Sequence, residues 1–152
     1  MSDQLILGDL ITLIQRDLSR LKRELELFND EANIWKNTEG VTNSAGSLTL
    51  HICGNLDHFI GSVVGSTGYV RDREAEFNDH SKSRVDLYLT IQDTGEMVEA
   101  ILSAKAEEEL AAVYPIEVFN SQMTLRFFFQ HLYGHLNYHL GQVNYLRRIL
   151  EP

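Results

Sequence analysis

The chain has a single cysteine, Cys53, and only two prolines among its 152 residues. One cysteine permits no internal disulfide, so nothing in the sequence indicates an oxidising compartment. No apolar run approaches the roughly 18 residues that a membrane-spanning helix requires. The first ten residues also lack the basic start and the long apolar stretch of a secretory signal. We therefore expect a cytoplasmic protein that does not interact with membranes.

Basic residues are scarce as well. Lysine and arginine total 13 against 22 acidic residues, which gives a formal net charge of −9. This balance provides no basic surface for the phosphates of a nucleic acid, so nucleic acid is excluded as a partner. The hydrophobic content of 43% and the charged content of 23% are ordinary for a globular protein. At this length we expect one domain over residues 1–152.

Apolar residues recur with the period of an α-helix in four long segments. One continuous stripe runs from Leu7 to Phe28, and three further helices are predicted at about 44–65, 84–104 and 121–150. The second and third of the intervening connections are too long for simple turns. The sequence therefore predicts an all-α fold, a four-helix bundle whose crossover connections distinguish it from a plain up-and-down arrangement.

The connections carry the signals that begin these helices. Residues 43–44 (Asn-Ser) supply N-cap side chains for the second helix, and either Ser81 or Ser83 can cap the third. The charged stretch 71–83 is expected to be a solvated crossover. Residues 107–120 contain a β-prone run and are expected to include a short extended piece.

Histidine is the most informative residue type, because His131, His135 and His139 follow one another at a spacing of four in the last predicted helix. Four residues advance roughly 400° around a helix and about 6 Å along it, so two such rings can reach one cation. A third histidine from a facing helix would complete a three-nitrogen metal site with an open coordination position. The plain alternative is a set of partly buried rings that hydrogen-bond to carbonyls or to Tyr133 and Tyr138.

The spacing alone does not choose the third ligand. His51 and His58 both lie near one face of the second predicted helix, but about 10 Å apart along it, so we expect only one of them to be a ligand. His131 lies roughly 80° around its helix from His139 and is expected outside the ligand set. His80 falls in the charged stretch and is expected to be solvated.

Two amides accompany these histidines. Asn55 follows His51 by one turn and Gln142 follows His139 by three residues, so both are candidates for orienting a substrate. The alternative for each is an ordinary polar contact between helices. Cys53 points about 200° away from His51, so we expect a buried and inert thiol. No glycine-rich phosphate loop, GxSxG or CxxC motif is present.

Five short stretches together resemble the DinB/YfiT-like superfamily of metal-dependent four-helix-bundle proteins. They are residues 35–36 (WK), 43–44 (NS), 50–56 (LHICGNL), 71–77 (RDREAEF) and 135–142 (HLNYHLGQ). The resemblance implies a bundle with a long crossover between its second and third helices, assembled as a homodimer. It also implies that the metal ligands are His51, His135 and His139, with His58 and His131 outside the set.

A site of three imidazoles with a vacant position suits Zn²⁺, Ni²⁺, Fe²⁺ or Co²⁺. Relatives in the resembled superfamily are thiol-dependent transferases and isomerases in which the metal activates a low-molecular-weight thiol. The resemblance therefore implies a metal-dependent enzyme that activates a thiol or water for transfer or hydrolysis on a small molecule. The alternative is a non-catalytic metal-binding or stress-response bundle protein. No general base stands beside the histidines in the sequence.

Overall fold

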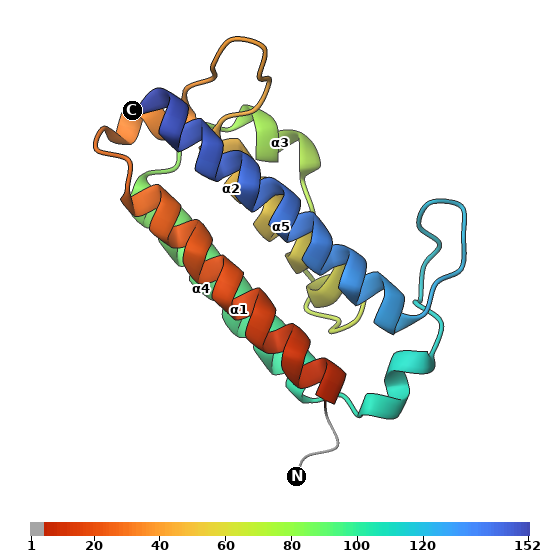
Figure 1. Ribbon diagram of the computed structural model, residues 1–152. Helices are drawn as coiled ribbons and strands as arrows, with labels where there is room; N and C mark the ends of the chain where they lie inside the picture. Colours follow the sequence, from red (N-terminus) through yellow and green to blue (C-terminus); the bar gives the residue numbers. More distant parts are fainter. Residues whose placement is uncertain (1–4) are drawn as a thin grey trace.

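The computed structural model describes residues 5–152, and nearly all of its regular structure is helical (Figure 1). The α-helices are α1 (Leu5–Glu26), α2 (Ala45–Leu56), α3 (Arg73–Asn78), α4 (Arg84–Ser103) and α5 (Leu125–Leu150). Two 3₁₀-helices (Glu31–Trp35 and Glu107–Ala111) and one π-helix (Asp57–Ser62) lie between them. Residues 5–152 contain no β-strand, so the predicted all-α fold is confirmed.

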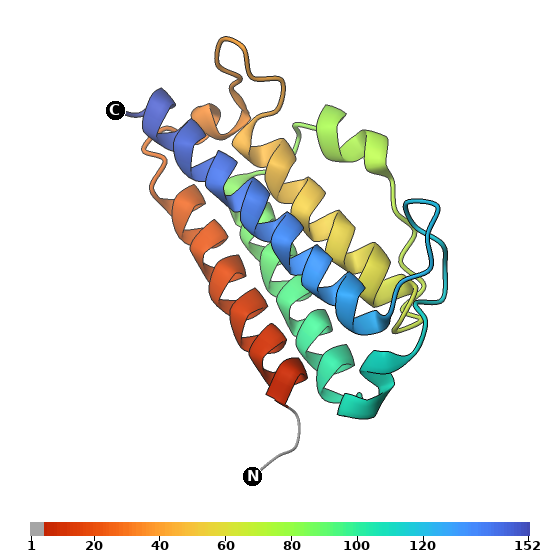
Figure 2. The same ribbon diagram turned by 45° about the vertical axis from the view of Figure 1, so that its right-hand side comes forward.

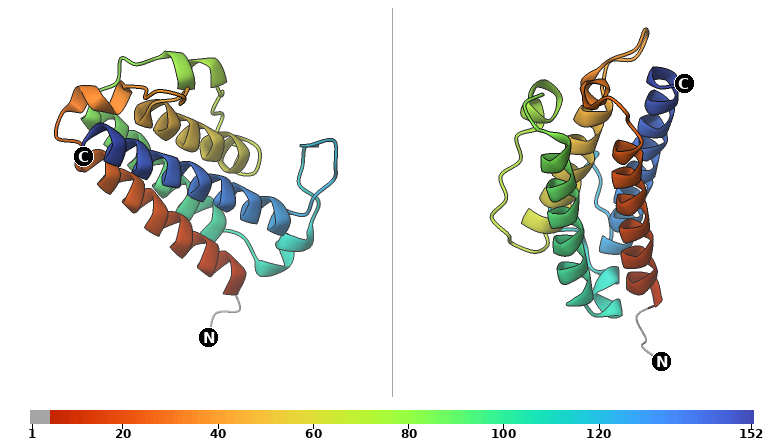
Figure 3. Two further views of the ribbon diagram at one scale, coloured as in Figure 1. Left: turned by 45° about the horizontal axis from the view of Figure 1, so that its top comes forward. Right: turned by 90° about the vertical axis from the view of Figure 1, so that its left-hand side faces the viewer.

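The four long helices form a bundle in which α1 and α2 lie diagonally opposite each other. Each of these two packs against both α4 and α5. Helices α1 and α5 run in one direction and α2 and α4 in the other (Figures 1 and 2). Because α2 and α4 are parallel neighbours, the chain must return along the bundle between them. The segment 63–83 makes this return and carries α3, which lies against the outer side of α2 (Figure 3).

The core is built from the inward stripes of these helices. On α1 the buried apolar residues follow spacings of three and four, as the periodicity predicted: Leu7, Leu10, Ile14, Leu18, Leu21 and Leu25. Helix α2 differs, because all twelve of its residues are buried. It is covered by α4, α5 and α3 together, so any polar side chain on α2 needs a partner inside the protein.

Side-chain caps set the starts of the long helices. Ser44 accepts a hydrogen bond from the backbone N–H of Ser47, and Ser83 forms a reciprocal capping box with Asp86. The last helix begins at Leu125, four residues later than predicted, because Thr124 is its N-cap and is still paired with the preceding loop in a β-bridge.

The second predicted helix, 44–65, is only partly right. Its α-helical part ends at Leu56 and a π-helix continues it to Ser62. Here the chain lies close against α4, and a Cβ at Gly65 would overlap the side chain of Ile101. The glycine therefore permits the turn that follows the π-helix to lie against α4.

The charged stretch 71–83 is a crossover, but the prediction that it is solvated is wrong for part of it. Glu76 on α3 is 5% exposed. The end of the stretch is fixed by Trp35, whose Nε1 donates to the carbonyl of Lys82 (3.2 Å) and whose ring stacks on His80 at 5.1 Å between centroids. His80 is exposed as expected, yet it packs against an aromatic ring.

The segment between α4 and α5 contains a 3₁₀-helix rather than only extended chain. Two isolated β-bridges, Val113 with Thr124 and Val118 with Ser121, close a loop beyond it. In the described part of the chain, no helix is both long and apolar enough to cross a membrane.

Candidate metal centre

Three histidine side chains converge between α2 and α5. His51 comes from α2, and His135 and His139 lie one turn apart on α5. The Nε2 atoms of His51 and His135 are 3.1 Å apart, and one ring nitrogen of each histidine lies within 4.8 Å of the other two. Tetrahedral zinc, bound at about 2.05 Å, would hold its nitrogen ligands about 3.3 Å apart. The spacing of these three nitrogens therefore suits a single ion.

The protonation of these rings also suits a metal. Burial lowers the pKa of His135 to about 3, and the neighbouring His139 and His51 act in the same direction. Burial likewise lowers the pKa of His139. Both rings are therefore neutral at pH 7, which is the state in which imidazole binds a metal.

Hydrogen bonds fix the tautomers of two of the three rings. Nδ1 of His51 lies 2.9 Å from a carboxylate oxygen of Glu76, and Nδ1 of His139 lies 2.7 Å from the amide oxygen of Gln142. Because these oxygens only accept, each of these two contacts requires the proton on Nδ1. Nη2 of Arg71 also lies 3.3 Å from Nδ1 of His51, but it donates to Glu76 at 2.9 Å, so the shorter carboxylate contact decides the tautomer. Each Nε2 then presents its lone pair to the cluster, as in the carboxylate–histidine–metal arrangement of metalloenzymes.

Glu76 and Arg71 are the functional residues that the sequence analysis missed. Glu76 accepts from Nε of Arg71 at 2.8 Å and from its Nη2 at 2.9 Å, in addition to the bond from His51. Burial alone would raise the pKa of Glu76, but the hydrogen bonds from His51 and Arg71 outweigh it and lower the pKa. A Cβ at Gly54 would overlap the Glu76 carboxylate, so this glycine makes room for the contact on α2.

The remaining histidines lie outside the cluster. His58 is half-buried on the π-helix with its ring against Phe59 (4.7 Å between centroids), and His80 stacks on Trp35. His131 is exposed on α5, one turn before His135. The structure thus brings together His51, His135 and His139, the three that the resemblance selected.

The two amide candidates have different surroundings. Gln142 is exposed and contacts His139, so it orients a ring of the cluster. Asn55 is 7% exposed, and its Oδ1 is buried without a hydrogen-bond partner in residues 5–152. Cys53 is buried as expected, and burial raises the pKa of its thiol to about 12, so it is not a nucleophile at neutral pH.

A cavity of about 220 Å³ opens beside the cluster and is lined by His51, His135 and Asn55 among others. A larger hollow of about 400 Å³ lies toward the end of α5 and includes Gln142, but none of the three histidines. Two of the three histidines, His51 and His135, therefore border a cavity that a small molecule can enter.

An all-α bundle with three convergent histidines beside a cavity belongs to the class of proteins that can bind a metal ion between helices. The chain is a member of the family described as "Protein of unknown function (DUF1572)", whose model matches residues 6–152. No curated protein matches the chain. The family assigns no activity, so the geometry of the site has to carry the functional inference.

Proposed function

We propose that the protein is a metal-dependent enzyme of the DinB/YfiT-like superfamily that acts on a small molecule. His51, His135 and His139 would bind one divalent ion, with Zn²⁺, Ni²⁺ and Fe²⁺ as the candidates. The observation that carries the proposal is the convergence of three histidine ring nitrogens, with the rings of His135 and His139 neutral at pH 7, beside a cavity that is lined by His51 and His135.

The number of ligands favours chemistry over a structural role. Structural zinc sites are closed by four protein ligands, whereas catalytic sites use three and leave a position open. Within residues 5–152, no carboxylate or thiol joins the three histidines in the cluster. Glu76 touches His51 from behind and does not enter the set. The fourth position is therefore left for a substrate or for water.

A divalent ion held there would supply Lewis-acid activation, lowering the pKa of a small thiol or of water. The protein's own contribution is to hold the ligands: Glu76 fixes His51 and Gln142 fixes His139. Glu76 is not available as a general base, because both of its oxygens are bonded to Arg71. This supports a mechanism in which the nucleophile is activated without a protein base. A thiol as co-substrate and assembly as a homodimer remain predictions of the resemblance.

The metal content of untagged protein, measured by elemental mass spectrometry, tests the proposal. We expect about one ion per chain after incubation with zinc or nickel, and its loss in His51→Ala and in His139→Ala. His58→Ala and His80→Ala are the matched controls and should keep the ion. Protein with bound metal would then be assayed for transfer of small thiols to electrophiles, with and without chelator.

Two results would contradict this assignment. Wild-type protein that binds neither zinc nor nickel would leave a histidine-rich bundle without a metal centre. Loss of the ion in His58→Ala but not in His51→Ala would show that α2 contributes the other histidine.

A further inference from the structure

The cavity beside the histidines has a cationic lining in an acidic protein. Besides His51, His135 and Asn55, it is lined by two arginines, a third histidine and apolar side chains: Arg71, Arg73, His131, Phe59, Val118, Phe119, Phe128 and Leu132. No carboxylate lines it, although the chain as a whole has a formal charge of −9. Two arginines thus border the cavity, although Glu76 is ion-paired with Arg71 from outside the lining and offsets one of the two charges.

Arg71 has hydrogen-bonding capacity left over. Its Nε and Nη2 are bonded to Glu76 and Nη2 also lies 3.3 Å from Nδ1 of His51, while its Nη1 has no partner in residues 5–152. The guanidinium lies 5.9 Å from the centroid of the Phe59 ring, which is also part of the cavity wall. Arg71 is thus held in place from one side and has two N–H groups free on the other.

Arg73 contributes a charge that nothing in the described chain neutralises. Its guanidinium lies 5.5 Å from the centroid of the Phe77 ring and forms neither an ion pair nor a hydrogen bond with residues 5–152. A solvated surface arginine would be an ordinary finding elsewhere on the molecule. Here the same side chain lines the cavity together with Arg71.

Asn55 supplies an independent indication of a ligand. Its Oδ1 lacks a partner at 7% exposure, and no hydrogen bond from its amide nitrogen is present in residues 5–152. Buried side-chain amides nearly always have partners, because an unmade hydrogen bond leaves the loss of hydration uncompensated. Since Asn55 lines the cavity, a molecule bound there can provide the missing partner.

We propose that the cavity binds an anionic oxygen group of the substrate, a carboxylate or a phosphate, through Arg71 and Arg73. Asn55 accepts a hydrogen bond from a hydroxyl or amino group beside that anion. The proposal rests on the proposed function, because it places this group next to the three histidines. At about 220 Å³ the cavity is smaller than the roughly 300–1,000 Å³ of drug-sized pockets, so the substrate is small or only partly enclosed.

Titration of ¹⁵N-labelled protein, followed by NMR, tests the anion site. The probes are acetate, inorganic phosphate and acetamide, which is the neutral counterpart of acetate. Each is added through the millimolar range to chelator-treated protein and to zinc-loaded protein. The chelator-treated sample isolates the arginines from any direct binding of the anion to zinc.

We expect acetate or phosphate, but not acetamide, to shift the amides around the cavity in the chelator-treated protein. Arg73→Gln should weaken this binding roughly 10- to 100-fold. Arg148→Gln removes the same charge from an exposed site at the end of α5 and should leave the affinity unchanged. Acetate and phosphate, compared in the wild type, show which anion the site prefers.

The role of Asn55 has its own comparison. Glycolate differs from acetate by a hydroxyl group, so the wild type should bind glycolate roughly 2- to 10-fold more tightly. Asn55→Leu keeps a similar volume and should abolish this preference while acetate still binds. A preference that survives in Asn55→Leu would show that Asn55 does not accept the hydrogen bond.

The anion site would be overturned if neither anion bound, or if Arg73→Gln and Arg148→Gln weakened binding equally. The first result excludes the site. The second would show that the anions respond to the overall charge of the protein and not to Arg73. These outcomes are distinct from failure of the metal centre. If the protein bound no zinc but Arg73→Gln still removed anion binding, the anion site would stand and the metal-dependent function would not.

Discussion

Two buried carboxylates, Asp17 on α1 and Glu76 on α3, are both bound by arginine but support different contacts between helices. Each is less than 6% exposed and each is held by arginine. Each also connects its helix to a polar group on another helix. They differ in what their hydrogen-bond networks reach: the Asp17 network ends at side chains of α1 and α5, whereas the Glu76 network continues into the histidine cluster.

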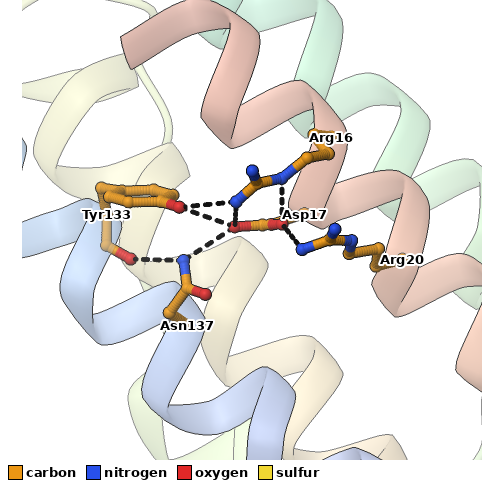
Figure 4. Close-up of polar contacts among 5 residues, drawn as sticks. All are labelled: Arg16, Asp17, Arg20, Tyr133 and Asn137. Carbon is orange, nitrogen blue, oxygen red and sulfur yellow. Dashed lines mark hydrogen bonds and ion pairs between the residues drawn. The ribbon is translucent and has the colours of Figure 1, made fainter. Parts of the chain in front are cut away.

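Around Asp17 the network is closed. Its carboxylate accepts from Arg16 (2.9 Å) and Arg20 (3.1 Å) on its own helix, and from the Tyr133 hydroxyl (3.0 Å) and the Asn137 amide (2.7 Å) on α5 (Figure 4). The two arginines are 43% and 59% exposed, so their remaining N–H groups can be satisfied by water. The cluster therefore fastens α1 to α5.

Around Glu76 the network remains open. Its carboxylate orients the His51 ring through Nδ1. The other ring nitrogen of His51, Nε2, faces His135 and His139. Both clusters use α5 through pairs of residues four apart. Tyr133 and Asn137 face α1, whereas His135 and His139, offset by two residues, face α2. An offset of two residues turns the helix by about 200°, so α5 contacts α1 through the Asp17 cluster on one face and contributes to the histidine cluster on the opposite face.

Metal affinity is the property in which substitutions at Glu76 and at Asp17 should differ most. Glu76→Gln removes the charge behind His51 and should weaken metal binding about 10- to 100-fold, because carboxylates that orient a ligating histidine contribute that much. Asp17→Asn is the matched control, since it removes the same charge from the closed cluster. Competition with a chromogenic chelator measures both variants, and equal affinities in the two would remove the distinction between the clusters.

A second, smaller effect concerns folding. Asp17→Asn should lower the free energy of unfolding of metal-free protein by about 1–2 kcal/mol, because the Asn side chain, with a single acceptor oxygen, cannot accept from all four donor residues as the carboxylate does. We expect the value to stay in this range because both arginines are partly exposed and can turn to water. Urea denaturation followed by circular dichroism measures it. A change below about 0.3 kcal/mol would mean that the cluster contributes little to holding α1 against α5.

The smallest expected effect is the pH dependence of the difference in unfolding free energy between the wild type and Asp17→Asn. Burial alone would raise the pKa of Asp17, but the hydrogen bonds from Arg16, Asn137 and Tyr133 bring it below its ordinary value. A lowered pKa in the folded state gives stability that is present above the unfolded pKa of about 4 and is lost as the pH falls through the folded pKa. The wild type should therefore exceed Asp17→Asn in stability most at pH 6, and the gap should narrow toward pH 3.

Unfolding of both metal-free proteins across this pH range measures the gap. Protonation of His135 and His139, whose pKa values are lowered by burial, destabilises both proteins to the same extent and cancels in the comparison. A gap that stayed constant down to pH 3 would show that the charge of Asp17 is not what holds its partners.

The sequence was sufficient for the four long helices because their signals are local, whereas the short helix α3 was not predicted. The apolar period, the Ser44 and Ser83 caps and the long connections predicted the four long helices and the crossover between α2 and α4. The least accurate predictions were at 57–62, where the helix widens, and at 121–124, where a β-bridge delays the start of α5. Both depend on contacts with distant segments, and periodicity carries no information about such contacts.

For the site, the sequence by itself determined that histidines four residues apart share one face of the last helix, whatever surrounds them; this spacing fits His131 and His135 as well as His135 and His139, and the resemblance selected the second pair. The choice of His51 over His58 required the resemblance, since both fit the same face of the predicted helix. Only the tertiary structure decided that Glu76 and Arg71 belong to the site. Their segment reaches α2 through long-range packing, in which Gly54 leaves space for the carboxylate, and no local pattern of residues encodes that approach.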